Sequence, residues 1–137
     1  MRASVLMGIL AGAALVAIGA PALAHHSFSA EFDNNKRITL TGVVTKVEWM
    51  NPHTYFYIDV KDPATGKVTN WGCEMGSPNG LVARGWTRDT LKVGMVVTVP
   101  DAATAKNGTN KCNGNSVRFA DGRQLDSDSS SQNPRTQ

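Results

Sequence analysis

A long apolar run opens the chain, and short alternating segments follow it. The run Val5 to Ala20 carries no charge, Arg2 precedes it, and small residues close it at Ala22 and Ala24. This order is typical of a secretory signal peptide. The run is shorter than the ~20 residues that a membrane span needs. We therefore expect a signal peptide over residues 1–24, and a periplasmic or secreted mature chain without a membrane anchor.

Period-two alternation of apolar and polar residues predicts three strands in the first half of the mature chain. Residues 38–49 alternate with a phase slip after Gly42, which indicates a strand with a bulge or a sharp bend. Residues 55–60 alternate strictly. A turn at 62–66 then leads into a return strand at 67–75, so these two segments form a hairpin.

The second half predicts one short helix and two further strands. Ser77 and Pro78 suit the start of a helix that ends near Gly85. A strand at 95–99 stops at Pro100, and a polar loop from Asp101 to Asn115 precedes a last strand at 116–120.

Strand, strand, strand, helix, strand, strand is the order of an OB-fold. The predicted fold is all-β with one short helix, a small five-stranded OB-like barrel, and the alternative is a small β-sandwich. We expect residues 25–37 to form an N-terminal arm, 38–125 the β domain, and 126–137 a polar, disordered tail.

Charge and motifs exclude several classes of protein. The net charge is only +3 and basic residues are scattered along the chain, so we expect no nucleic-acid partner. The chain has neither a Gly-x-Ser-x-Gly elbow nor a glycine-rich phosphate loop. No pair of carboxylates has the defined spacing of a glycosidase. These absences favour binding over catalysis.

Cys73 and Cys112 are the only cysteines. An even pair in an exported protein indicates one disulfide bond. The alternative is a soft metal site that uses Cys112 as a ligand.

The three histidines suggest a copper site. Cleavage after Ala24 makes His25 the first residue, whose α-amine and ring Nδ1 can chelate one metal ion. The amine has an ordinary pKa of about 7.7 and an imidazole one of about 6.5, so both can be free bases at neutral pH. With His53 as third nitrogen and His26 as auxiliary ligand, the set suits copper(II), which favours nitrogen ligands in a plane.

Three other interpretations of these histidines stay open. Zinc could use the same ligands in a more tetrahedral arrangement. His25 and His26 could be only a remnant of cleavage, and His53 only a loop residue. The carboxylates that could serve as axial or outer ligands of the metal are Glu31, Asp33, Glu48 and Asp59.

Trp49, Tyr55 and Tyr57 lie on or beside the first two predicted strands. In OB-folds the face of strands 2 and 3 binds ligands, and aromatic side chains there can stack on bases or sugars. These three residues could therefore form a ligand face. The alternative is that they pack under the N-terminal arm, against Phe28 and Phe32.

Six motifs along the mature chain belong together: His25-His26-Ser27-Phe28, Ala30-Glu31-Phe32-Asp33, Leu40-Thr41-Gly42-Val43-Val44, Val47-Glu48-Trp49 with Asn51-Pro52-His53, Glu74-Met75-Gly76-Ser77-Pro78-Asn79-Gly80-Leu81 and Gly85-Trp86-Thr87. These motifs resemble those of a family of small exported bacterial proteins that is classed as a domain of unknown function. The resemblance covers roughly residues 25–125 and implies a periplasmic location and a small β domain. The resemblance also leads us to expect an aliphatic residue where Cys73 stands, which implies that the disulfide is particular to this member.

The leading hypothesis is a small exported copper(II)-binding protein that buffers copper or delivers it to a periplasmic protein partner. The alternative is a metal-free ligand- or protein-interaction module that uses the face around Trp49, Tyr55 and Tyr57.

Overall fold

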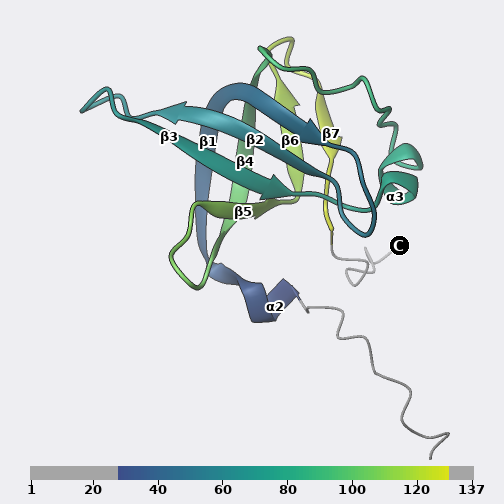
Figure 1. Cartoon of the computed structure of the whole chain (residues 1–137), viewed down its shortest axis with the longest axis horizontal. Helices are drawn as coiled ribbons and strands as arrows, with labels where there is room; N and C mark the ends of the chain where they lie inside the picture. Colours follow the sequence, from purple (N-terminus) through teal and green to yellow (C-terminus); the bar gives the residue numbers. More distant parts are fainter. Residues whose placement is uncertain (1–27, 130–137) are drawn as a thin grey trace, which may run out of the picture.

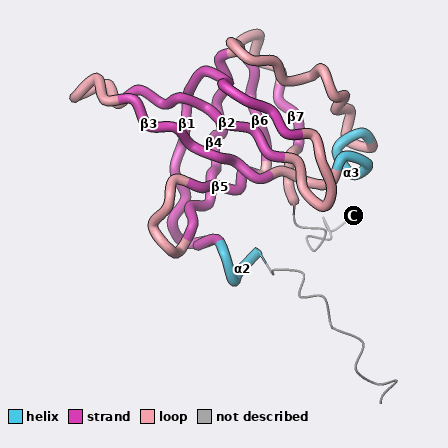
Figure 2. Tube along the Cα trace, in the orientation of Figure 1, coloured by secondary structure: helices cyan, strands magenta, loops and turns pink. Residues whose placement is uncertain are grey.

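A single β-sheet with two short helices makes up the computed structural model, which describes residues 28–129 (Figures 1 and 2). The predicted signal peptide, His25, His26 and residues 130–137 lie outside the described residues. In chain order the elements are α2 (Phe28–Glu31), β1 (Phe32–Glu48), β2 (Tyr55–Lys61), β3 (Val68–Glu74), α3 (Pro78–Val82), β4 (Val96–Ala105), β5 (Lys111–Gly114), β6 (Ser116–Phe119) and β7 (Gln124–Asp126).

Five of the strands close into a ring. The sheet order is β1-β2-β3-β5-β4, and β4 pairs again with β1. The β3–β5 pair is parallel and the other pairs of the ring are antiparallel. The predicted all-β, five-stranded, OB-like barrel is confirmed. As predicted, α3 lies between β3 and β4, and the Ser77 side chain accepts a hydrogen bond from Gly80 N at its start.

Gly42 lets the long strand β1 serve two neighbours. The part before it pairs with β4, and the part after it pairs with β2. A Cβ atom at Gly42 would lie 2.5 Å from the backbone oxygen of Asp59, so only glycine permits this close approach. The register with β2 also shifts between Val44 and Lys46. The bend and bulge predicted for this strand are confirmed.

The strand that completes the ring is not the predicted one. The stretch from Asp101 to Asn115 was expected to be a polar loop, but β4 continues to Ala105 and β5 occupies Lys111–Gly114. Pro100 does not stop β4 because the β1–β4 register shifts at this point, opposite Thr39, and an irregularity of this kind tolerates proline. The predicted last strand exists as β6, which pairs with β4 outside the ring.

Both predicted ends of the β domain differ from the structure. β1 begins at Phe32 rather than at residue 38, because residues 32–38 pair with the extended part of β4. At the other end, residues 126–129 contact the barrel. Ser127 is buried and donates its backbone N–H to Asn115 O, and the indole of Trp86 donates to Asp126 O at 2.6 Å. The predicted tail therefore cannot begin at residue 126.

The disulfide between Cys73 and Cys112 joins β3 to β5 inside the core. Both residues are fully buried. The predicted bond is confirmed, and the alternative with Cys112 as a metal ligand is wrong because neither sulfur is a free thiolate.

Candidate functional site

His53 lies in the connection between β1 and β2, directly after the cis Asn51–Pro52 peptide bond. Its side chain is 32% exposed. Ring atom Nδ1 lies 3.3 Å from Met75 O and 3.7 Å from Oε1 of Glu74. Both neighbours are acceptors, so they favour the tautomer whose proton is on Nδ1. The lone pair is then on Nε2, which forms no hydrogen bond or ion pair with any residue that the structure describes.

The β2–β3 hairpin brings these groups together. Its pairing continues beyond the strand ends, where Thr54 N donates to Gly76 O at 3.0 Å and Met75 N donates to Thr54 O at 2.8 Å. Tyr55 stands opposite Glu74 in the register. His53 therefore follows the same ladder and faces the end of β3.

Tyr55 fixes the Glu74 carboxylate. The phenol donates to Oε2 of Glu74 at 3.1 Å, and the Glu74 side chain is only 12% exposed. Burial, followed by the negative charge of Glu74, raises the pKa of Tyr55 to about 12. The phenol stays protonated at neutral pH and remains a donor, so one carboxylate oxygen binds Tyr55 while the other faces His53.

None of the four predicted carboxylates contacts His53 within the described chain. Glu31 pairs with Lys111 at 3.7 Å, and Oδ1 of Asp33 accepts from Asn35 N at 2.9 Å. Asp59 accepts from Asn70 at 2.8 Å. Glu48 binds Lys46 and accepts from the Tyr57 hydroxyl at 2.9 Å. The hydrogen bond from Lys46, and then that from Tyr57, lowers the pKa of Glu48.

Glu74 is the carboxylate that the sequence analysis left out of the site. A signal for it was present, because the hairpin turn at 62–66 and the alternation of both strands together place Tyr55 opposite Glu74. Recognising Glu74 from the sequence requires the exact register of the hairpin, because a shift of one residue would turn its side chain to the other face of the sheet.

The start of the described chain packs against the end of β4 and the first residue after it. The backbone oxygen of Glu31 accepts from Lys106 N at 2.9 Å. The charge of Glu31 also contributes, after burial and Glu74, to the raised pKa of Tyr55. His25 and His26 precede this segment, outside the described residues. Within residues 28–129, no group of three or more His, Cys, Asp or Glu residues could hold a metal ion.

The three aromatic residues of the alternative hypothesis do not share one face. Tyr55 and Tyr57 alternate with the buried Phe56 and lie on the outer surface of the sheet. Trp49 instead packs against the hydrophobic core. Phe28 and Phe32 stack at a centroid distance of 5.5 Å and pack with Ala103 and Ala105.

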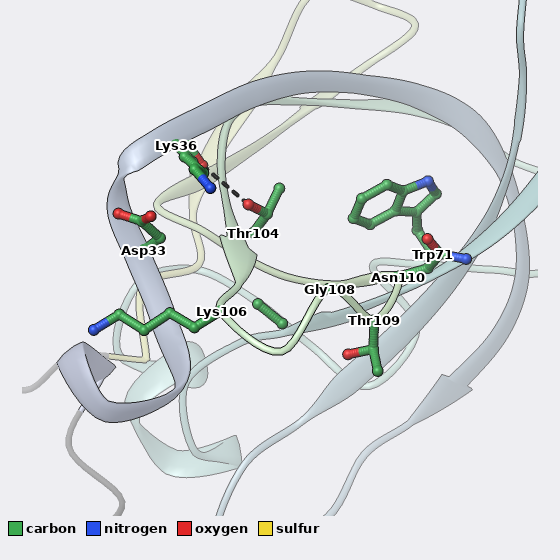
Figure 3. A pocket seen from close by; sticks show the side chains of 9 residues that line it. Asp33, Lys36, Trp71, Thr104, Lys106, Gly108, Thr109 and Asn110 are labelled. Carbon is green, nitrogen blue, oxygen red and sulfur yellow. Dashed lines mark hydrogen bonds between the residues drawn. The ribbon is translucent and has the colours of Figure 1, made fainter.

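A separate cavity of about 360 Å³ opens beside Trp71. Asp33 and Lys36 of β1, Thr104 of β4 and the β4–β5 connection line it (Figure 3). Trp71 is half-buried, with one part against the core and another against this cavity.

In a comparison with family models, a family of unknown function (DUF6152) matches residues 13–114. The chain belongs to this family. No curated protein and no solved structure matches the chain.

The match to the family of unknown function contains the whole five-stranded ring and ends where β5 ends, at Gly114. It includes His53, Glu74 and Tyr55, whereas β6 and β7 follow it. The family description gives no activity, so the function is argued from the site. Within the described residues, no helix is long and apolar enough to cross a membrane.

Proposed function

We propose that this chain is an exported copper(II)-binding protein. Its ligands are the α-amine and ring Nδ1 of His25 and the Nε2 atom of His53, with His26 as an auxiliary ligand. Export rests on the pattern of the first 24 residues, and cleavage after Ala24 creates the terminal amine. The protein holds copper for buffering or for delivery to a periplasmic protein partner.

The orientation of His53 carries the proposal. A histidine that binds a metal through one nitrogen commonly donates its other N–H to a carboxylate or a backbone carbonyl. Nδ1 of His53 has both kinds of acceptor, Glu74 and Met75 O, within 3.7 Å. The opposite nitrogen is left with a lone pair on a side chain that is one-third exposed. This arrangement prepares His53 to be a ligand through Nε2.

The donor set favours copper(II) over metals that need thiolate ligands or a tetrahedral site. Copper(II) accepts three nitrogen ligands in a plane. Structural zinc sites commonly require four ligands, often including thiolates. Both cysteines are in the disulfide, so thiolate ligands are not available. Zinc at the same histidines remains the alternative that the copper experiment must exclude.

The segment between His25 and the described chain is short. The described chain begins at Phe28, three residues after His25, and three residues span at most about 10 Å. Glu31 acts electrostatically on Tyr55, which in turn binds Glu74 beside His53. We therefore propose that the N-terminal segment reaches His53.

The test is a titration of the chain that begins at His25 with copper(II), followed by isothermal calorimetry. We expect one copper ion per chain and a tetragonal nitrogen site in electron paramagnetic resonance. His53→Ala and a chain with one extra residue before His25 should each weaken binding sharply, because each removes part of the ligand set. The matched control is Asn51→Ala, in the same connection. Equal copper affinity in all four chains would contradict the proposal, and equally tight zinc binding would contradict its choice of metal.

The metal-free alternative would use the outer face of Tyr55 and Tyr57, without Trp49. Both hydroxyls are already hydrogen-bonded to carboxylates, Glu74 and Glu48, so this face offers few unoccupied polar groups. It becomes the leading proposal only if the titration detects no copper binding.

A further inference from the structure

The cavity beside Trp71 lies where two strands of the ring separate. β3 and β5 pair only from Gly72 and Lys111 onward. Gly72 N also donates to Asn110 O at 3.0 Å, which attaches the β4–β5 connection to β3 at this point. Trp71 comes directly before the first paired residue and borders the gap. This part of the barrel is therefore open to a ligand rather than closed by a strand ladder.

Trp71 and two charged residues lie on opposite sides of the opening. Figure 3 shows the indole on one side, Asp33 and Lys36 of β1 on the other, and Thr104 between them. The Thr104 hydroxyl donates to Lys36 O at 3.3 Å, which holds β1 and β4 together along this wall. The cavity of about 360 Å³ is within the usual range for small-molecule sites.

The lining has the chemistry that binds sugars. A half-exposed indole offers a flat apolar surface with low conformational freedom, which matches the C–H face of a pyranose ring. The Asp33 carboxylate, the Thr104 hydroxyl and the Asn110 amide can exchange hydrogen bonds with the hydroxyl groups on the rim of such a ring.

The charged residues that line the cavity add a preference for the charge of the ligand. Two lysines, Lys36 and Lys106, and one acidic residue, Asp33, line the cavity. Lys106 also donates to the backbone oxygen of Ser29, whereas the Lys36 residue is exposed. The excess of positive charge favours an anionic ligand.

We propose that this cavity binds a short acidic saccharide, with a sugar ring stacked on Trp71 and a carboxylate facing Lys36. The site is separate from the proposed copper ligands, since none of its lining residues contacts His53 or Glu74 in the described chain. Binding should therefore occur without copper.

The experiment is calorimetric titration of the metal-free chain with trigalacturonic acid, with maltotriose and adenosine monophosphate as comparison probes. We expect saturable binding of one trigalacturonic acid that weakens as salt is added, because the lysines are screened. Lys36→Gln should weaken it about tenfold, the loss of one hydrogen bond to a charged group. Trp71→Ala should abolish binding.

The matched control is Lys67→Gln, which removes an equally exposed lysine from the β2–β3 hairpin and should bind as the unchanged chain does. If Trp71→Ala does not fold, as judged by circular dichroism, Lys36→Gln still decides the matter. No binding of trigalacturonic acid, an unaffected Lys36→Gln variant, or tighter binding of maltotriose or adenosine monophosphate would overturn the proposal.

Discussion

At the scale of single residues, the orientation of the His53 ring depends on groups at the end of β3. Glu74 and Met75 O both lie on the Nδ1 side of the ring, and Tyr55 holds the Glu74 carboxylate in turn. The ring orientation is thus set by Met75 O and by the Glu74 carboxylate, which Tyr55 holds in place.

Glu74→Gln is expected to weaken copper(II) binding by about 10- to 100-fold, the usual cost of removing a group that orients a metal ligand. The amide oxygen can still accept from Tyr55, so the fold should be retained. The control is Glu48→Gln, which changes a carboxylate of β1 that accepts a hydrogen bond from Tyr57 instead. Calorimetry should separate the two variants, and equal losses in both would contradict the role of Glu74.

The two tyrosines should ionise above their usual pH. Burial is the largest cause in both, and it raises the pKa of Tyr57 and brings that of Tyr55 to about 12. These are the only tyrosines of the chain, so ultraviolet absorbance at pH 10 should show less phenolate in the folded chain than in the unfolded chain. Phenolate formation at the ordinary pH in the folded chain would contradict the Tyr55–Glu74 contact.

The same shift makes stability fall at alkaline pH. A phenol whose pKa is higher in the folded chain stabilises the fold below the unfolded pKa, which is about 10, and this stabilisation is lost as the pH rises toward 12. Tyr55→Phe should therefore flatten this part of the stability profile, as measured by denaturant unfolding at each pH. An unchanged dependence of stability on pH in Tyr55→Phe would contradict this role of Tyr55.

At the scale of elements, β1 organises the barrel because it pairs with β2 and β4 on the two sides of Gly42. Gly42→Ala places a Cβ atom 2.5 Å from Asp59 O. We expect a loss of about 1–3 kcal/mol in the free energy of unfolding, the usual cost of overpacking. Denaturant unfolding measures this loss. The control is Val43→Ala, because Val43 is the next residue in the strand and its side chain is exposed. An unchanged free energy of unfolding in Gly42→Ala would contradict this close approach of β1 and β2.

The sequence predicted the elements whose signals are local. The phase slip after Gly42, the β2–β3 hairpin and the Ser77 cap all depend on residues close in the chain, and the structure confirms each of them. β5 was missed because its four residues contain no alternation of large apolar side chains and Pro100 suggested a stop. Its place is set by pairing with β3 and β4, which are distant in sequence.

In the candidate site too, residues with a local signal were predicted and those placed by long-range pairing were not. His53 was predicted from its residue type and from the two histidines at the expected mature terminus. Glu74 could not be chosen among the carboxylates without the hairpin register. The Trp71 cavity could not be predicted either, because it arises where the pairing of β3 with β5 begins and beside the paired strands β1 and β4.

At the scale of the whole molecule, the Cys73–Cys112 bond closes a loop with a sequence separation of 39. The chain-entropy model gives about 4 kcal/mol for a loop of this size. The double variant Cys73→Ala/Cys112→Ala should lose stability of that order in denaturant unfolding. Its folded form should bind copper as the unchanged chain does, because both cysteines are buried and bonded to each other. Unchanged stability would contradict the structural role of the bond.

Native mass spectrometry of the full chain, exported by a bacterial cell and supplied with copper(II), tests the central claim most directly. The account predicts a mass that begins at His25 and retains one copper ion, and a His53→Ala chain that begins at the same residue without copper. A mass that begins elsewhere, or a metal-free species from the unchanged chain, would contradict the copper site built from the mature terminus and His53.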